Sequence, residues 1–355
     1  MKAYEPQRSL AIGRAGDQRR QIDTLRGLAC LALVVFHTVG ADRNSGLRIP
    51  DEHGLRLFND VLAYVRMPLF SFLSGYVYAL RPVSGSGLRF IKGKVRRLLV
   101  PMLLVGTLFA ILQANVPGSN FNQYDWRLLH IVPVAHYWFL ESLFIVFAVI
   151  LLLERAHWLG DGARFAGVWL AAAALFVMDP FPRYFGLSGA TYLFPFVLLG
   201  IACHRSLGRW PDAVALPWIG LALVSLAGLT WGLTSELPRT TSVLGLAFGT
   251  CACLLLFRSR VESTMFAAIG RYSFAIFLFH SVFSAASRIV LGRFGQFPTS
   301  LLMACGIVAA LIGPIVVERL LRRSGLAIGA WMLGVKPSTL GIAVPPSATE
   351  SGAKP

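Results

Sequence analysis

Apolar segments long enough to cross a bilayer recur along this 355-residue chain. A hydrocarbon core about 30 Å thick needs roughly 20 helical residues, and only helices or closed barrels satisfy their own backbone hydrogen bonds there. Hydrophobic residues make up 55% of the sequence and charged residues only 14%. We therefore predict an all-α, polytopic integral membrane protein with about ten transmembrane helices. The expected spans are residues 23–40, 61–80, 98–115, 136–153, 163–179, 188–204, 212–233, 240–257, 265–290 and 298–318.

The positive charges set the expected orientation of these helices. Lys and Arg concentrate on the cytoplasmic side of membrane proteins. When the loops are assigned alternately, 22 of the 33 Lys and Arg fall on the side of the N-terminus and 8 on the other, and Arg26, Arg66 and Arg271 remain within or at the ends of spans. Both termini are thus expected to be cytoplasmic, in a multi-pass protein of the cell inner membrane. The same distribution explains the net charge of +16, so we expect no nucleic-acid partner.

Three regions are expected along the chain. Residues 1–21 form a basic cytoplasmic segment, residues 22–323 a membrane domain, and residues 324–355 a cytoplasmic tail that is largely disordered because it ends in a Pro- and Ser-containing stretch without periodicity. Charged residues interrupt the first apolar run, so we interpret it as a retained helix and not as a cleaved signal. All five cysteines lie in apolar stretches, and Cys251 and Cys253 have no further ligands close in sequence; no metal site is expected.

Arg26 and His37 stand eleven residues apart in the first span. Eleven residues make about three helical turns, so the two side chains point the same way and are separated by roughly 16 Å along the axis. Ionisable side chains inside a membrane are costly unless they face the protein interior, and they are functional candidates for that reason. The alternative for Arg26 is an interfacial anchor that pairs with Asp23, three residues earlier.

The alternating direction of the spans gives each intramembrane polar side chain an expected depth. His37, Arg66, Glu141 and His280 come from four spans and are all assigned to the outer half, with His136 at the rim. A neutral imidazole can take a proton from a hydroxyl and return it, and a nearby carboxylate can orient that imidazole. Two alternatives stay open: the histidines only join helices, and Glu141 and Arg66 form a structural ion pair.

Five motifs, in order, resemble those of the membrane-bound acyltransferase 3 family, which O-acylates glycans and lipids. They are RQIDTLRGLACLALVVFH with its R-x10-H spacing, MPLFSFLSGYVYA, KVRRLLVP, HYWFLESLF and GRYSFAIFLFH. The resemblance runs from about residue 20 to 320, so residues 22–323 would be the acyltransferase domain, similar to the branch of sugar O-acetylases. Glu141 follows Trp138 by three positions, whereas many members place an acidic residue five positions after this Trp.

The resemblance implies an O-acyltransferase, most simply an O-acetyltransferase. It would transfer an acyl group from cytoplasmic acyl-CoA, such as acetyl-CoA, to a hydroxyl of a glycan, glycolipid or glycosylated metabolite. Acyl-CoA is then a substrate, and no bound cofactor is expected; membrane lipids surround the protein. The implied site residues are catalytic His37, Glu141 and His280, donor-binding Arg26, Arg96 and Arg97, and Arg66, His136 and Trp138 of the substrate pocket.

Two other classes of function fit an intramembrane polar layer. A transporter or a flippase of a lipid-linked glycan would use the same residues to bind a moving substrate, and such proteins often contain repeated halves. The sequence shows no repeat. A noncatalytic scaffold would tolerate alanine at all of these positions.

Overall fold

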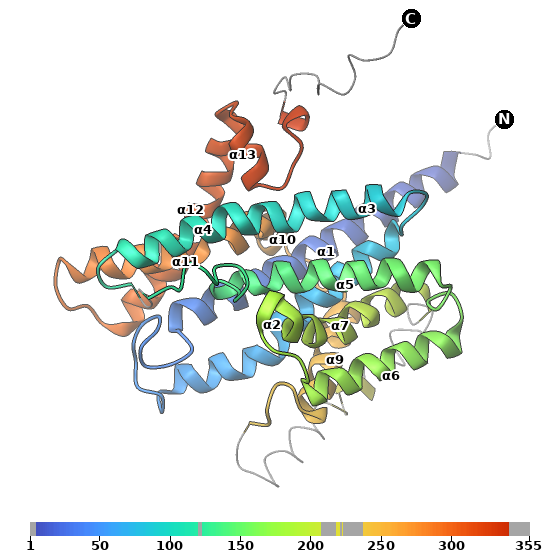
Figure 1. Ribbon diagram of the computed structural model, residues 1–355, viewed down its shortest axis with the longest axis horizontal. Helices are drawn as coiled ribbons and strands as arrows, with labels where there is room; N and C mark the ends of the chain where they lie inside the picture. Colours follow the sequence, from blue (N-terminus) through green and yellow to red (C-terminus); the bar gives the residue numbers. More distant parts are fainter. Residues whose placement is uncertain (1–4, 120–122, 207–217, 221, 223–236, 341–355) are drawn as a thin grey trace, which may run out of the picture.

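The computed structural model describes residues 5–119, 123–206, 218–220, 222 and 237–340. The described residues are helical or irregular apart from an isolated bridge between Leu129 and Val132, so the all-α prediction is confirmed for them. Figure 1 shows the long helices lying alongside one another. The named elements are α1 (Glu5–Val39), α2 (Gly54–Leu80), α3 (Gly87–Lys94), η1 (Val95–Leu99), α4 (Val100–Asn115), η2 (Ala135–Tyr137), α5 (Trp138–Arg155), α6 (Gly162–Met178), η3 (Tyr184–Gly186), α7 (Leu187–Arg205), α9 (Val243–Arg258), α10 (Thr264–Arg271), α11 (Ser273–Gly292), α12 (Thr299–Arg323), α13 (Ala327–Met332) and η5 (Pro337–Leu340).

Six helical segments of the described chain are long and apolar enough to cross a membrane, so the chain is a multi-pass membrane protein. They are Gly16–Val39, Gly87–Asn115, Ala135–Arg155, Tyr184–Arg205, Ser273–Gly292 and Thr299–Arg323. Helices α6 and α9 are apolar but shorter. The expected span 212–233 lies outside the described residues apart from 218–220 and 222. A total of about ten spans therefore stays a prediction.

The expected single helix over 265–290 is two helices in the structure. Helix α10 ends at Arg271 and α11 begins at Ser273, with Tyr272 between them in a non-helical conformation (φ −101°, ψ 12°). Ser263 caps the start of α10 by accepting a hydrogen bond from the amide of Phe266. The apolar run continues through Tyr272, so hydropathy alone gave no sign of the break.

Helices α2 and α7 approach each other backbone to backbone through glycine. A Cβ at Gly200 would overlap the carbonyl oxygen of Phe72, and one at Gly75 would overlap the carbonyl oxygen of Val197. Small residues at such crossings allow close van der Waals packing, which is a main source of helix association in lipid. The core cluster surrounds this crossing and includes the fully buried Leu73.

Replacing Gly200 by leucine is expected to force α2 and α7 apart. Overpacking costs about 1–3 kcal/mol or more where, as here, backbone blocks the new side chain. We expect a lower melting temperature in detergent and a smaller yield of monodisperse protein. Gly167→Leu on α6 is the matched control, because nothing lies within 4 Å of a Cβ at that position. Equal melting temperatures for the two variants would contradict the close α2–α7 contact.

Candidate active site

Three histidines from distant parts of the chain meet at one point. His37 lies near the end of α1, His136 lies in the 3-10 turn η2 before α5, and His280 lies near the middle of α11. The ring centroid of His37 is 4.8 Å from that of His280 and 5.4 Å from that of His136, and the other two centroids are 4.7 Å apart. His136 and His280 are buried, and His37 is partly buried. We call these three residues the histidine cluster.

Packing and a strained turn place His136 in the cluster. The hydroxyl of Tyr137 donates a hydrogen bond to the carbonyl oxygen of Leu278 at 2.6 Å and so fastens η2 to α11. Ala135, immediately before His136, has a left-handed backbone (φ +44°). Left-handed backbone at a non-glycine residue costs of order 1–3 kcal/mol and persists where surrounding structure imposes it. Here it turns the imidazole of His136 toward α1 and α11.

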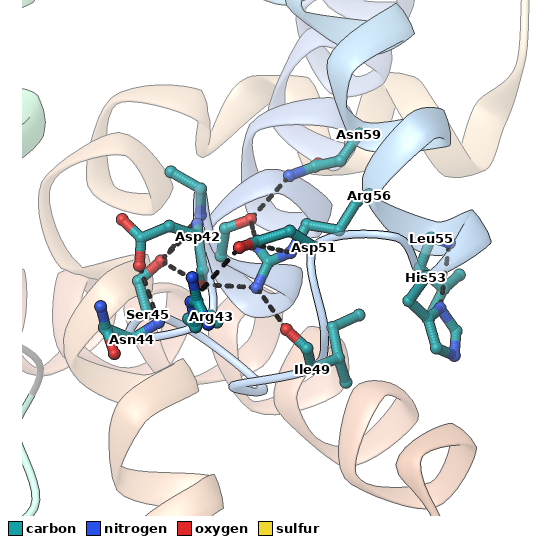
Figure 2. A network of polar contacts seen from close by, with 12 residues as sticks. Asp42, Arg43, Asn44, Ser45, Ile49, Asp51, His53, Leu55, Arg56 and Asn59 are labelled. Atoms are coloured by element: carbon teal, nitrogen blue, oxygen red, sulfur yellow. Dashed lines mark hydrogen bonds and ion pairs between the residues drawn. The ribbon is translucent and has the colours of Figure 1, made fainter.

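A buried arginine holds the end of α1 against the start of α2, as Figure 2 shows. Arg56 is 4% exposed and donates hydrogen bonds to the carbonyl oxygens of Gly40, Asp42 and Ile49. Asn59, one turn further along α2, donates to the same carbonyl of Gly40 at 3.1 Å. These bonds fix the loop that begins three residues after His37. Arg56 and Asn59 were not predicted as site residues.

A cavity of about 390 Å³ opens beside the cluster. His37 and His136 form part of its wall together with the hydroxyl-bearing residues Ser281 and Ser284, and most of the remaining wall is apolar, for example Phe109. The volume is in the range of small-molecule sites, which are largely apolar with a few polar groups that orient the ligand. Proton-transferring side chains and a substrate-sized space thus occur together. Ser281 was not predicted as a site residue, because a serine in an apolar helix has no distinguishing sequence signal.

The remaining members of the predicted polar layer are Arg66 and Glu141. The guanidinium carbon of Arg66 sits 3.3 Å from the ring centroid of Phe36, the neighbour of His37. Glu141 is 5% exposed, and its Oε2 atom has no hydrogen-bond partner among the described residues. No salt bridge within the described chain joins Glu141 to Arg66, so the alternative of a structural ion pair is not seen there. No ring or hydrogen-bond contact of the described residues joins Glu141 to His37.

Trp138 faces α7 and not the cavity. Its ring packs edge to face with Tyr192 at a centroid distance of 6.3 Å, and a Cβ at Gly189 would meet the same ring. Of the three residues predicted for the substrate pocket, only His136 belongs to the cavity wall. The assignment of Arg66 and Trp138 to a substrate pocket stays a prediction.

The predicted donor-binding residues form two groups. Helix α1 is continuous from Glu5 to Val39, so Arg26 lies roughly 16 Å from His37 along the axis. Arg26 pairs with Asp23 at 3.5 Å, and its side chain is 33% exposed. This is the pairing that the alternative interpretation of Arg26 expected.

Arg96 and Arg97 lie in a π-helical turn, η1, that interrupts the helix from Gly87 to Asn115. Short π-helical segments often mark functional sites, because the extra residue per turn re-aims side chains. Gly334, just after α13, packs on the backbone of Arg97. The segment that follows the last long helix therefore folds back onto this basic turn.

The three imidazoles of the histidine cluster lie close enough together to be a candidate metal site. All three ligand nitrogens lie within 4.8 Å of one another, and no other group of that kind occurs among the described residues. Three histidines on one tetrahedral ion, with bonds of about 2.0–2.1 Å, would bring their nitrogens to about 3.4 Å. The limit of 4.8 Å includes this separation, so the spacing does not exclude a metal ion.

The loop that leads into His136 contains a half-buried histidine. The Nε2 atom of His130 lies 2.8 Å from the hydroxyl of Thr107, and its Nδ1 atom is buried without a partner among the described residues. Burial lowers the pKa of His130 below its usual value. With Nε2 as the donor to Thr107, protonation would place a second N–H at Nδ1, where the described residues offer no acceptor.

Acidification is expected to loosen this loop. Because the folded loop keeps His130 neutral, the unfolded loop binds more protons below about pH 6.5, and stability falls as the pH falls through that value. Protection factors for hydrogen exchange, which correct for the slower intrinsic exchange at low pH, should therefore be smaller for residues 123–134 at about pH 5.5 than at about pH 7.5. A His130→Gln variant retains a donor for Thr107 and should lose this pH dependence. Identical pH dependence in both proteins would exclude His130 as the cause.

Comparison with known proteins assigns the chain to a family. The sequence matches the acyltransferase domain of the acyltransferase 3 family over residues 19–319, and the chain belongs to this family of membrane acyltransferases. It is also 28% identical over 174 residues to nodulation protein NolL of Mesorhizobium japonicum (strain LMG 29417 / CECT 9101 / MAFF 303099), a match that covers 47% of this chain and 44% of that protein. The chain thus aligns with less than half of the length of this relative. No solved structure matches the chain.

Proposed function

We propose that the protein is an O-acyltransferase, and specifically an O-acetyltransferase, of the cell inner membrane. Acyl-CoA, with acetyl-CoA as the simplest case, would donate the acyl group from the cytoplasm, and the acceptor would be a hydroxyl of a glycan, a glycolipid or a glycosylated metabolite. In this proposal the chain crosses the membrane about ten times and both termini are cytoplasmic. Membership of the acyltransferase 3 family supports the reaction class. The similarity to a nodulation protein is compatible with a sugar acceptor.

The observation that carries the proposal is the histidine cluster at the wall of a cavity. His37 reaches the cavity, and a neutral imidazole there can accept the proton that an attacking hydroxyl must lose. The ring centroids of His136 and His280 lie 5.4 and 4.8 Å from that of His37, and these two imidazoles would relay that proton. Arg66, stacked on Phe36 beside His37, would stabilise the negative charge that develops on the carbonyl oxygen.

The donor would bind at the cytoplasmic end of the helices. Arg26, Arg96 and Arg97 would contact the phosphate groups of acyl-CoA, for which guanidinium groups have suitable geometry.

Glu141 would act on the imidazole of His37 only through a rearrangement or a bridging group, because no direct contact joins the two in the described chain. We therefore keep Glu141 as a candidate and assign no step to it.

A vesicle experiment separates this proposal from a transporter or flippase. Protein is reconstituted in one orientation, with acetyl-CoA labelled in the acetyl group outside and a membrane glycolipid extract inside. A transferase places the label covalently on internal acceptor, and the product resists washing and is released by mild alkali. A transporter moves acceptor across the bilayer without labelling it. Unlabelled acceptor at full protein recovery would contradict the proposed function.

A further inference from the structure

The hydroxyl of Ser281 occupies an unusual place for a serine within an apolar helix. Ser71 and Ser74 of α2 show the common arrangement, in which the hydroxyl donates to the carbonyl four residues earlier at 2.8 Å. The corresponding acceptor for Ser281 is the carbonyl of Phe277, and the Nδ1 atom of His280 already lies 3.0 Å from it. The hydroxyl of Ser281 instead lies between two imidazoles and on the cavity wall.

The hydrogen bonds assign a tautomer to His280. Its Nδ1 atom lies 2.8 Å from the carbonyl oxygen of Ile276 and 3.0 Å from that of Phe277, and both of these groups can only accept. Nδ1 must therefore carry the hydrogen, and the Nε2 atom of the neutral ring presents a lone pair. The hydroxyl oxygen of Ser281 lies 3.2 Å from this Nε2 atom, so the serine donates its hydrogen to His280.

The same logic extends to His136. Because Ser281 donates to His280, its oxygen is free to accept, and the Nδ1 atom of His136 lies 3.4 Å away. A hydrogen on this Nδ1 leaves a lone pair on Nε2, which is buried and has no hydrogen-bond partner among the described residues. Only 5% of the surface of His136 is exposed. The hydroxyl of Ser281 thus lies between two imidazoles. His280 accepts its hydrogen and is held by two backbone carbonyls, and His136 lies on the other side.

We propose that Ser281 carries the acyl group between donor and acceptor as a serine ester. A hydroxyl bonded to a base that a third group orients is the arrangement of an activated nucleophile. This inference rests on the proposed acyltransferase function and adds a covalent intermediate to it. Ser281 is close to the middle of α11 and lies on the cavity wall, so its hydroxyl could hold the acyl group between the departure of CoA and the arrival of the acceptor.

The two half-reactions balance. In the first, Oγ of Ser281 attacks the thioester carbonyl carbon, its proton passes to Nε2 of His280, the carbon–sulfur bond breaks, and the thiolate of CoA takes that proton as it leaves. In the second, the acceptor oxygen attacks the ester carbonyl and gives its proton to the unprotonated nitrogen of His37 or His136. The bond from the carbonyl carbon to Oγ of Ser281 then breaks, and Oγ regains a proton through the histidine cluster. The two carbonyls on Nδ1 stabilise His280 while it is positively charged.

The first test requires no acceptor. Purified full-length protein in nanodiscs receives acetyl-CoA together with labelled free CoA. A reversible acyl-enzyme exchanges the label into acetyl-CoA, and peptide mass spectrometry then locates one acetyl group on Ser281.

Ser281→Ala should lose both the exchange and the modification and slow acetylation of cellular glycans by about 10²-fold or more. Ser281→Cys should form a thioester that neutral hydroxylamine cleaves. Ser287→Ala, on the same helix but outside the cavity wall, should behave as the wild type.

The outcomes separate failure of this inference from failure of the proposed function. An acetyl group on His37 in place of Ser281, or wild-type product formation by folded Ser281→Ala, would overturn the serine ester while acyltransfer stands. The same conclusion follows if the wild type acetylates glycans but shows no exchange and no modified peptide. If the wild type neither exchanges CoA nor yields acetylated product, the proposed function itself fails.

Discussion

Replacing His37 by glutamine is expected to lower acyl transfer about 10³-fold at unchanged protein abundance. General acid–base catalysis by one positioned side chain typically contributes 10²- to 10⁴-fold, and His37 is the member of the histidine cluster that is only partly buried and reaches the cavity. Glutamine retains much of the volume and one hydrogen-bond donor, so the helices should still pack. The rate loss corresponds to about 4 kcal/mol of transition-state stabilisation.

The measurement is acetylated glycan by mass spectrometry in membranes with equal amounts of each variant. His53→Asn is the control, because His53 caps the start of α2 on the exposed surface and asparagine is a good N-cap. The control should stay within about twofold of the wild type, since surface substitutions that keep a cap change stability little. Rates for His37→Gln above about a tenth of wild type would remove His37 from catalysis.

Replacing Arg56 by methionine is expected to have the second largest effect, on both stability and rate. Arg56 donates to three backbone carbonyls from a site that is 4% exposed, and methionine fills similar space without any donor. Hydrogen bonds to a charged group contribute about 1.5–3 kcal/mol each, so the loop after α1 should lose several kcal/mol of local stability. His37 lies within one helical turn of that loop, and a displacement of about 1 Å can cost about 10²-fold in rate.

Arg43→Met is the matched control for Arg56→Met. Both arginines contact Asp51, Arg43 at 3.5 Å and Arg56 at 3.7 Å, but the side chain of Arg43 is 76% exposed. Exposed ion pairs contribute about 0–1 kcal/mol. Hydrogen exchange over residues 36–56 and the rate of glycan acetylation should therefore change for Arg56→Met and stay near wild type for Arg43→Met. Equal effects of the two substitutions would contradict a positioning role for Arg56.

The family motifs located two members of the histidine cluster more precisely than hydropathy located the helices. The R-x10-H spacing placed Arg26 and His37 on one face of α1, and the late GRYSFAIFLFH segment contained His280; both histidines are in the cluster. The boundaries of helices were less certain, because the apolar run over 265–290 hides the break at Tyr272. Residues 212–233 lie almost wholly outside the described chain, so the sequence still provides the only description of that span.

The sequence predicted a common depth for the polar side chains, but not which of them are in contact. The alternating direction of spans put His37, Arg66, Glu141 and His280 in one layer. The structure joins His37 to His280 and to His136, stacks Arg66 on the neighbouring Phe36, and leaves Glu141 without a partner among the described residues. Two side chains at the same depth can lie on opposite sides of a bundle, and rotation about each helix axis depends on packing with neighbouring helices.

The sequence by itself determined that this chain is a helical membrane protein with ionisable groups inside its spans, because hydropathy and charge are properties of consecutive residues. Only the tertiary structure decided which of those groups act together. The hydroxyl of Ser281 lies beside the imidazole of His136, 145 positions earlier in the chain, and the guanidinium of Arg56 binds carbonyls of a loop up to 16 positions earlier. Such roles arise from three-dimensional hydrogen-bond partners, and a one-dimensional pattern contains no record of them.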